Sequence, residues 1–501
     1  MSHAAKCPLV LSSLGAALLA IACLPVHAAT AATSTATASC QASTTLPAQA
    51  IAWGSFERPF AASAPWNSRP VGASLGTATI PTSSYYPMVS TGAYSSAAFK
   101  ATAADGPMTI VGTTTAGVWD PDSEIRRPSI TIPRWPAGVI PASGSDGHAE
   151  VVDTVSGIVH SFWKLKPVGG VWQAAQYAWT PLSGRGMGDA SHYFQGARAA
   201  GVSTLGGLIR KHEVADGDTM YRHALAMSLT FNALAASPSY RFPATSADGN
   251  ATTTNSGTIQ MGSLMMLPAS FDAQALRTPE LRKVAETLKA YGAYVVDRNV
   301  GTPFYIYVEN GADFKLHKNG WNSIAASELG QLRQALRPLA TASSWLDGNG
   351  RSVDPAAPQN LLSMRGYWYK TKGPQAGVFD TWRQAVVFPA TSTPIEQTNS
   401  GGRAYSGVAW AKPTVDTSYR LTAIATNGAR FRMTVKDKAT GALAFDSGDL
   451  SNGQSIDLVW LSDTFTITTT AKSGVSGVES SVRADLRAVP AAAQAVSPGC
   501  I

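Results

Sequence analysis

Histidine, carboxylate and lysine side chains recur at every second position along two neighbouring strand-like runs of the sequence. The first run carries His148 and Glu150, and the second carries His160, Phe162 and Lys164. Because strand side chains alternate between two faces, each set shares one face, and in the simplest hairpin register Glu150 lies opposite His160. A carboxylate beside imidazoles orients the rings and tunes their pKa values. We therefore expect His148, Glu150 and His160 to take part in general acid–base catalysis.

The same pattern has two other interpretations. It also fits an ordinary solvated sheet face with polar residues at alternate positions. Metal ligation by His148 and His160 is a further alternative, although we assign no metal. In the catalytic interpretation, Lys164 shares the face and is expected to contact the substrate.

A second group of candidates combines a tyrosine, a histidine and two arginines. Tyr221 and His223 stand two residues apart in a run typical of a buried strand, with Arg222 between them, and Arg210 follows a Gly-Gly pair upstream. A Tyr/His pair can abstract a proton in a lyase, and an arginine can neutralise a substrate carboxylate. We expect Tyr221 and His223 to be catalytic and the arginines to bind substrate. The alternative is a buried histidine satisfied by a polar neighbour.

A third run, residues 304–309, alternates apolar side chains with Tyr305, Tyr307 and Glu309. Aromatic rings stack on the apolar faces of sugars while carboxylates bind their hydroxyls, so the two tyrosines are expected to bind a sugar. Glu309 is expected to be catalytic, paired with Glu150 if the protein is a glycoside hydrolase. Because tyrosine is also a good strand former, a purely structural role is the alternative.

Three carboxylates, Asp120, Asp122 and Glu124, alternate in one short loop. Such oxygen ligands suit Ca²⁺, but the loop lacks the glycine and terminal acid of an EF-hand. We expect a plain acidic turn and no cofactor, with a Ca²⁺ site as the alternative.

The elements that must position these residues are predicted to be mainly β. The chain has 501 residues, of which 14% are charged, with 45 Gly and 30 Pro. This composition predicts two or three domains and a mainly β fold with inserted helices (α+β). We expect an antiparallel β-sandwich or jelly-roll main domain and a small C-terminal β-sandwich. The net charge of +7 is spread without a basic run, which disfavours a nucleic-acid partner.

The domain order follows from changes in composition. Residues 1–28 are predicted to be a signal peptide, residues 29–50 an Ala/Ser/Thr-rich linker, residues 51–390 the main domain and residues 404–496 the C-terminal β-sandwich. Within the main domain, helices are expected to begin at Thr278-Pro279 and after Asn322.

Export is the expected fate of the chain. We predict a secreted or periplasmic protein without a transmembrane segment, and lipoprotein anchoring at Cys23 is the alternative. Removal of the signal peptide leaves Cys40 and Cys500, which either form one disulfide between the ends of the chain or stay unpaired.

Several motifs resemble those of a group of secreted bacterial proteins. They are Ser63-Ala64-Pro65-Trp66-Asn67, Asp146-Gly147-His148, Gly207-Leu208-Ile209-Arg210 and His223-Ala224-Leu225-Ala226. The resemblance covers residues 58 to 310. It implies export from a bacterium and no particular activity.

These observations favour a secreted enzyme that cleaves glycosidic bonds in a polysaccharide, with a glycoside hydrolase slightly ahead. A polysaccharide lyase acting on an acidic glycan, or a non-catalytic glycan-binding or adhesion protein, is the alternative. One geometric question separates them. Catalysis requires the predicted acids and bases to converge in a cleft, whereas binding does not.

Overall fold

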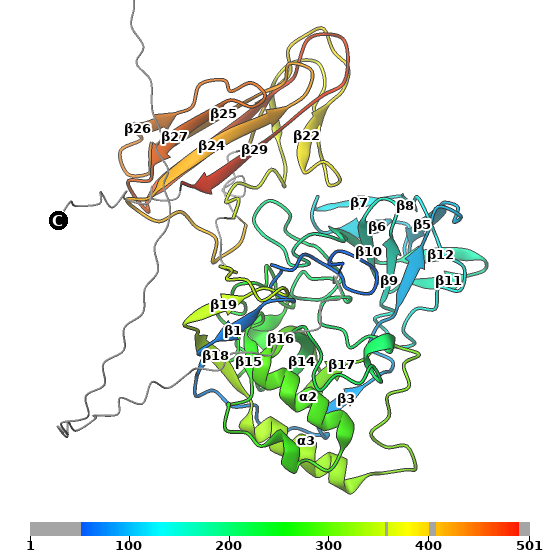
Figure 1. The fold of residues 1–501 in the computed structure, drawn as a ribbon. Helices are drawn as coiled ribbons and strands as arrows, with labels where there is room; N and C mark the ends of the chain where they lie inside the picture. Colours follow the sequence, from blue (N-terminus) through cyan, green and yellow to red (C-terminus); the bar gives the residue numbers. More distant parts are fainter. Residues whose placement is uncertain (1–51, 356–358, 400–406, 490–501) are drawn as a thin grey trace, which may run out of the picture. The chain divides into compact units, whose positions relative to one another are not determined.

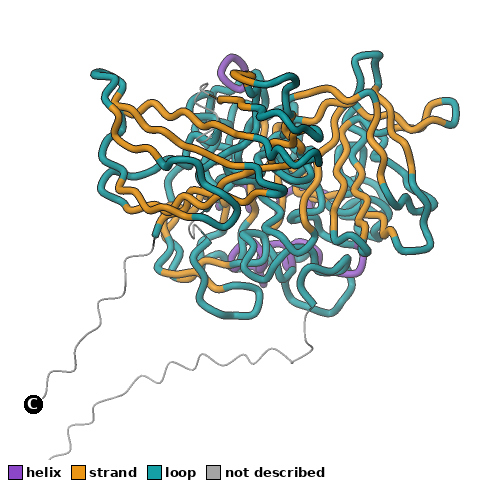
Figure 2. The backbone as a smooth tube through the Cα atoms, turned by 90° about the horizontal axis from the view of Figure 1, so that it is seen from above, coloured by secondary structure: helices purple, strands orange, loops and turns teal. Residues whose placement is uncertain are grey.

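The computed structural model describes residues 52–355, 359–399 and 407–489. The predicted signal peptide, the linker, Cys23, Cys40 and Cys500 lie outside the described residues, so these predictions stay predictions. Strands and loops make up most of the described backbone (Figure 2), and the mainly β fold with inserted helices is confirmed. Among the described residues, no helix is long and apolar enough to cross a membrane.

The first part of the chain forms a six-stranded sheet and a four-stranded sheet that share one core. Ile110 and Ile132 of the smaller sheet are buried with Phe162 and Tyr177 of the larger one. The six-stranded sheet runs β4 (Ala98–Ala101), β9 (Ala149–Asp153), β10 (Ile158–Trp163), β13 (Gln176–Pro181), β6 (Val118–Asp120) and β7 (Ile125–Arg127). The four-stranded sheet runs β11 (Lys166–Val168), β12 (Val171–Ala174), β5 (Met108–Gly112) and β8 (Ser129–Ile132).

A seven-stranded sheet follows, with two helices, α2 (Pro279–Ala290) and α3 (Ser323–Ala335), that lie side by side (Figure 1). Its strands β14 and β16 are parallel, so their buried runs need the helices to cover them. The order is β2 (Ser74–Leu75), β18 (Arg337–Thr341), β15 (Leu264–Met266), β16 (Ala293–Asn299), β14 (Leu225–Thr230), β17 (Phe304–Tyr307) and β3 (Met88–Ser90).

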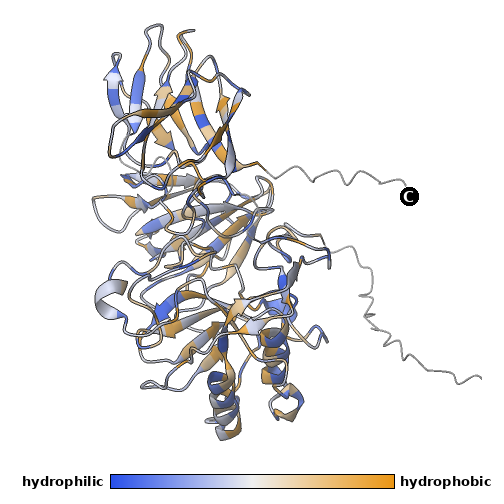
Figure 3. Ribbon diagram, turned by 90° about the vertical axis from the view of Figure 1, so that its left-hand side faces the viewer, coloured by the Kyte–Doolittle hydropathy of each residue, from blue (hydrophilic) through white to orange (hydrophobic). Residues whose placement is uncertain are grey.

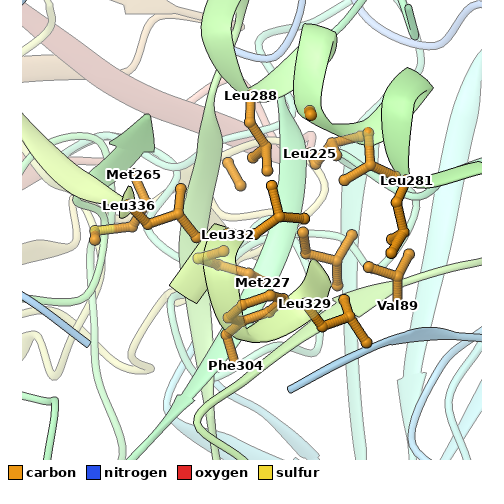
Figure 4. Close-up of a cluster of buried hydrophobic side chains, with 14 of the residues drawn as sticks. Val89, Leu225, Met227, Met265, Leu281, Leu288, Phe304, Leu329, Leu332 and Leu336 are labelled. Atoms are coloured by element: carbon orange, nitrogen blue, oxygen red, sulfur yellow. The ribbon is translucent and has the colours of Figure 1, made fainter. Parts of the chain in front are cut away.

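Both helices begin where the sequence predicts. Thr278 is the N-cap of α2 with Pro279 at its first position, and the Asn322 side chain accepts two amide N–H groups at the start of α3. Hydrophilic and hydrophobic residues alternate along the two helices (Figure 3), as expected of helices with one buried face. Figure 4 shows how their leucines, among them Leu288 and Leu332, pack with residues of the sheet such as Met227 and Phe304.

The last part of the chain forms two five-stranded antiparallel sheets around a common core. One sheet runs β20 (Tyr369–Lys372), β23 (Glu396–Asn399), β28 (Phe465–Lys472), β25 (Arg430–Asp437) and β26 (Leu443–Asp446). The other runs β21 (Val378–Asp380), β22 (Ala385–Phe388), β29 (Ser480–Ala488), β24 (Ser418–Ala425) and β27 (Ser455–Val459). Strands β20 to β22 lie within the predicted main domain yet pair into these sheets, so a boundary drawn by strand pairing would precede residue 369. The division into domains itself stays a prediction.

Short elements complete the described chain. Strand β1 (Arg69–Val71) pairs with β19 (Ser344–Leu346), which brings together segments more than 270 residues apart. The short helices are η1 (Lys211–Glu213), α1 (Ala251–Thr254) and η2 (Ala273–Ala275).

Candidate functional site

Strands β9 and β10 form the expected hairpin, but its register differs by one residue from the predicted one. Glu150 pairs with Ser161, and His160 pairs with Val151. Cross-strand partners share a face of the sheet, so Glu150 and His160 point to opposite faces. The turn fixes this register, because the Asp153 carboxylate accepts two N–H groups of the turn at 3.0 and 3.2 Å. The prediction that these side chains share one face is therefore wrong.

Both faces of this hairpin are buried, so neither forms an open cleft wall or a solvated sheet face. Glu150 is fully buried, and its carboxylate accepts the Ser161 hydroxyl at 2.6 Å. It also accepts the hydroxyl and the N–H of Thr204 at 2.6 and 2.7 Å. Burial raises the pKa of Glu150 to about 7, although these hydrogen bonds lower it in part. Protein donors thus occupy a carboxylate that the sequence predicts to face substrate.

The two histidines of the hairpin are core residues with little exposure. His148 Nδ1 donates to a backbone carbonyl of β10 at 3.2 Å, and burial lowers its pKa well below the usual value. His160 Nδ1 lies 2.8 Å from the Tyr177 hydroxyl, and burial lowers the pKa of His160 to about 4. Both are therefore neutral near pH 7. Lys164 is exposed, and its ammonium lies over the neighbouring Trp163 ring.

The tyrosines around β17 also contact protein. The Tyr305 hydroxyl donates to two backbone carbonyls at 3.0 and 2.9 Å. The Tyr307 ring lies 3.8 Å from the Arg198 guanidinium and is buried. Glu309 is buried and accepts Arg210 Nε at 2.9 Å. This run supplies internal contacts and no open sugar-binding face.

The acidic loop forms a structural turn. Asp120 accepts two backbone N–H groups of the loop and pairs with Arg127 at 3.1 Å. Asp122 accepts the Tyr193 N–H at 2.9 Å, and Glu124 contacts Arg365 at 3.2 Å. Because each carboxylate has different partners, the loop does not gather oxygens for Ca²⁺. In the described part of the chain, no group of three His, Cys, Asp or Glu side chains could hold a metal ion.

Three predicted residues, Arg210, Arg222 and His223, do come together in one narrow pocket. The room for water inside it is about 20 Å³, enough for one or two water molecules. Its remaining polar and aromatic lining comprises Trp53, Glu57, Arg58, Phe60, Trp66, Asn67 and Glu213.

A glycine allows the pocket to form. Gly207 has a φ of +68°, and a Cβ there would lie 2.5 Å from the Ala226 nitrogen and 2.7 Å from the Trp66 ring. Only glycine fits this close approach without strain. The Ala226 N–H donates to the Gly207 carbonyl at 2.8 Å, which ties the segment before Arg210 to β14 and so to His223.

His223 and Glu213 form a charged pair at the pocket wall. His223 Nε2 lies 3.2 Å from a Glu213 oxygen, and Nδ1 donates to the Ala224 carbonyl at 2.8 Å. Burial alone would lower the pKa of His223, but the charge and hydrogen bond of Glu213 raise it. Burial would likewise raise the pKa of Glu213, yet His223 lowers it to about 2. A carbonyl at Nδ1 and a carboxylate at Nε2 are both acceptors, so this geometry favours the charged form of the His223 ring.

Most other charges of the pocket have partners. Arg210 pairs with Glu309, and Arg222 forms two hydrogen bonds to Asp218 at 2.9 and 3.1 Å. Glu57, which also lines the pocket, lies 3.8 Å from Lys100, a residue that does not line it.

Arg58, unlike these groups, has no carboxylate partner among the described residues. Its guanidinium lies 5.7 Å from the Trp53 ring centroid, and among the described residues no carboxylate forms an ion pair with it. Arg58 thus has no ion-pair partner among the described residues, although its charge, after the hydrogen bond and charge of Arg222, helps to lower the pKa of Asp218.

The sequence prediction missed Arg58, Glu213 and Trp53. Glu213 follows Arg210 closely and was within reach of sequence reasoning, because a carboxylate near a histidine is a recognisable pair. Arg58 and Trp53 lie more than 140 residues before Arg210, and no spacing rule connects them. Tyr221, a predicted catalytic residue, is buried in the core, with Lys283 4.6 Å from its ring.

One serine motif also needs its structural context. Residues 72–76 read Gly-Ala-Ser-Leu-Gly, which matches the spacing of an esterase nucleophile elbow. Such an elbow turns sharply from a strand into a helix, whereas Ser74 lies within the two-residue strand β2, which pairs with β18. The context therefore differs from that of a nucleophilic serine.

No family model matches the sequence, and no curated protein matches it. Among solved structures, the CBM4 carbohydrate-binding module is 20% identical over 24% of this chain and 94% of its own, with a TM-score of 0.15. TmCBM61 in complex with β-1,4-galactotriose is 11% identical over 26% of this chain and 97% of its own, with a TM-score of 0.18. Accessory secretory protein 1,2 and 3 of Streptococcus pneumoniae is 11% identical over 21% of this chain and 85% of the other, with a TM-score of 0.14. With TM-scores this low, the similarities do not indicate a function for this chain.

Proposed function

We propose that this protein binds an acidic polysaccharide, with the pocket around Arg58 and His223 taking the carboxylate of one uronic acid. One observation carries the proposal: three arginines and a histidine, Arg58, Arg210, Arg222 and His223, line a single narrow pocket. Secretion, as expected from the N-terminal sequence, would bring such a protein into contact with extracellular glycans.

The charge of the pocket favours an anionic ligand group. Arg210, Arg222 and His223 each have a carboxylate partner, whereas the positive charge of Arg58 has none among the described residues. An anion entering the pocket would meet Arg58 at a site where neighbouring protein shields both from water, so their attraction is stronger than at an open surface.

The size and walls of the pocket narrow the ligand class further. With about 20 Å³ of room for water, it admits a small group such as a carboxylate while the remainder of the ligand stays outside. The Trp53 indole is half-buried, with the Arg58 guanidinium over its ring and its N–H donating to Asn349 at 2.8 Å. Its remaining exposed surface is aromatic, and aromatic rings stack on pyranose rings. A uronic acid combines both features.

The geometry supports binding over hydrolysis. A glycoside hydrolase needs two carboxyl groups on either side of the scissile bond. The predicted pair, Glu150 and Glu309, is fully enclosed, and each carboxylate is occupied by protein donors. Neither carboxylate reaches a ligand without rearrangement of the core.

Proton abstraction by His223 is disfavoured for a related reason. A general base needs a free nitrogen lone pair, whereas both nitrogens of His223 face protein acceptors and the Glu213 carboxylate raises the pKa of the ring. A protonated imidazole suits charge stabilisation of a bound anion. The lyase alternative therefore becomes an outcome to be tested.

The proposal is tested by affinity electrophoresis of the full chain through gels containing polygalacturonate, alginate or hyaluronan, beside neutral xylan and galactan. We expect retardation in at least one acidic gel and none in the neutral ones, and we expect Arg58→Ala to abolish most of it. Arg420→Ala, which removes an exposed arginine of β24 paired with Asp457, is the matched control. Equal retardation of both variants would overturn the role of Arg58. New absorbance from unsaturated uronates would instead establish a lyase.

A further inference from the structure

A second hollow lies between the segments that lead into α2 and α3. It offers about 510 Å³, within the range of small-molecule binding sites. Arg277 and Glu280 line it from the α2 side, and Lys315, Lys318 and Trp321 line it from the segment before α3. Unlike the narrow pocket, it has room for whole sugar residues.

The aromatic wall of this hollow is exposed yet held in place. Trp321 is 61% exposed, and its ring stacks on His317 with centroids 4.7 Å apart and an interplanar angle of 8°. His317 Nδ1 accepts the Asn322 N–H at 2.9 Å, which fixes the position of the imidazole. Tyr86, 60% exposed, lies 4.9 Å from the Trp321 ring. Adjacent large aromatics left this open to solvent are typical of a binding surface.

The charged wall favours an anionic ligand. Arg277, Lys315 and Lys318 are exposed at the hollow, and they face one lining carboxylate, Glu280. Lys318 lies 3.4 Å from Glu280, which leaves two cations in excess. Exposed aromatic rings can stack on a sugar ring, and the excess positive charge can attract a carboxylate on that sugar.

The first turn of α2 connects the hollow with the narrow pocket. Glu280 lines the hollow, and Lys283, three residues later, donates from Nζ to the Glu213 carbonyl at 2.6 Å. Lys283 lies on the buried face of α2, so this helix links the wall of the hollow with the Glu213 segment through the protein interior.

We propose that the hollow around Trp321 is a second subsite, which binds a further uronic acid residue of the polysaccharide held at Arg58. The inference rests on the proposed function and adds to it that the ligand is recognised as a polymer. A monosaccharide occupies one site at a time, whereas an oligosaccharide that bridges both gains from the effective concentration of its second end.

Titration calorimetry with galacturonate and with a galacturonate hexamer tests the inference. We expect Trp321→Ala and Lys318→Glu to weaken hexamer binding about tenfold and to leave monosaccharide binding at the Arg58 pocket unchanged. Tyr94→Ala is the matched control, since Tyr94 is 53% exposed and lines neither the narrow pocket nor the hollow. Thermal melts verify that each variant is folded.

The possible failures are distinguishable. If Arg58→Ala weakens hexamer binding while Trp321→Ala and Lys318→Glu do not, the second subsite is wrong and the proposed function stands. If the unmodified chain binds neither the monosaccharide nor the hexamer, nor any acidic polymer of the panel, both proposals are overturned.

Discussion

At the scale of single residues, burial and partners decide what each carboxylate and histidine does. Glu150 and Glu309 are both buried glutamates, but only Glu309 is paired with an arginine. Glu150 accepts hydrogen bonds from uncharged donors, the hydroxyls of Ser161 and Thr204 and one backbone N–H.

Burial lowers the pKa of His160 to about 4 despite the charge of Asp153, whereas Glu213, 3.2 Å away, raises the pKa of His223. The sequence showed these residue types and not their partners, which lie far away in the chain.

The Glu213–His223 pair predicts a pH window for stability. The raised pKa of His223 contributes stability that is fully present below its unfolded value of 6.5 and is lost as pH rises through the folded pKa. The lowered pKa of Glu213 contributes stability that is present above 4.5 and is lost as pH falls towards 2. The pair is thus most stabilising between pH 4.5 and 6.5.

We expect Glu213→Gln to lower the free energy of unfolding by about 2 kcal/mol at pH 5.5 and by less at pH 9. Urea unfolding at both pH values measures this difference. The amide oxygen of the substituted side chain can still accept the Arg210 N–H, so the change reports on the charge. A loss that is equal at both pH values would contradict a protonated His223.

We expect substitution by glutamine to affect stability differently at Glu150 and at Glu309. The pKa of Glu150 is raised to about 7, so the wild-type protein loses stability as pH rises from 4.5 to 7. Glu150→Gln has no such pH-dependent loss. We therefore expect its free energy of unfolding, compared with that of wild type, to be higher at pH 8 than at pH 4. Glu309→Gln leaves Arg210 buried without its partner and should cost about 3–5 kcal/mol at pH 7.

Unfolding measurements at pH 4 and pH 8 on the two variants decide this. Equal destabilisation of both at pH 8 would show that Glu150 is charged and needed, as an active-site carboxylate would be.

At the scale of elements, the sequence predicts where helices begin, but it does not predict the register in which two strands pair. The starts of α2 and α3 depend on Pro279 and on Asn322, whose effects act within a few residues, so sequence alone predicts them. The β9–β10 register depends on how Asp153 closes the turn, and one residue of slip moves every side chain to the other face. The register therefore depends on contacts in the folded protein.

Asp153 is therefore expected to contribute more to stability than its position at the end of β9 suggests. It accepts two turn N–H groups and binds Arg134 at 2.9 Å with its own side chain fully buried. Asp153→Ala should lower the free energy of unfolding by about 2–3 kcal/mol, measured in urea. Asp457→Ala, which breaks the exposed pair with Arg420, is the control and should barely move the midpoint. Similar midpoints for the two variants would contradict the role assigned to the turn.

At the scale of the whole molecule, the mainly β composition predicted the fold class, but the site is assembled from distant segments. The pocket joins residues 53–67 to residues 205–223, and Glu309 reaches it through Arg210. The alternation of side chains along a strand predicts which residues share a face. It does not predict a site that is formed by segments far apart in the sequence. This is why three of the predicted residues lie together at the pocket and Arg58 was absent from the prediction.

The central claim is that Arg58 binds the carboxylate of an acidic glycan. Titration calorimetry of wild type, Arg58→Ala and Arg58→Lys with the acidic polymer that the gels identify tests it most directly. We expect Arg58→Ala to weaken binding about tenfold and Arg58→Lys to restore part of it, with all affinities falling as salt screens the charge. Unchanged affinity in Arg58→Ala, or equal binding of a neutral polymer, would contradict the claim.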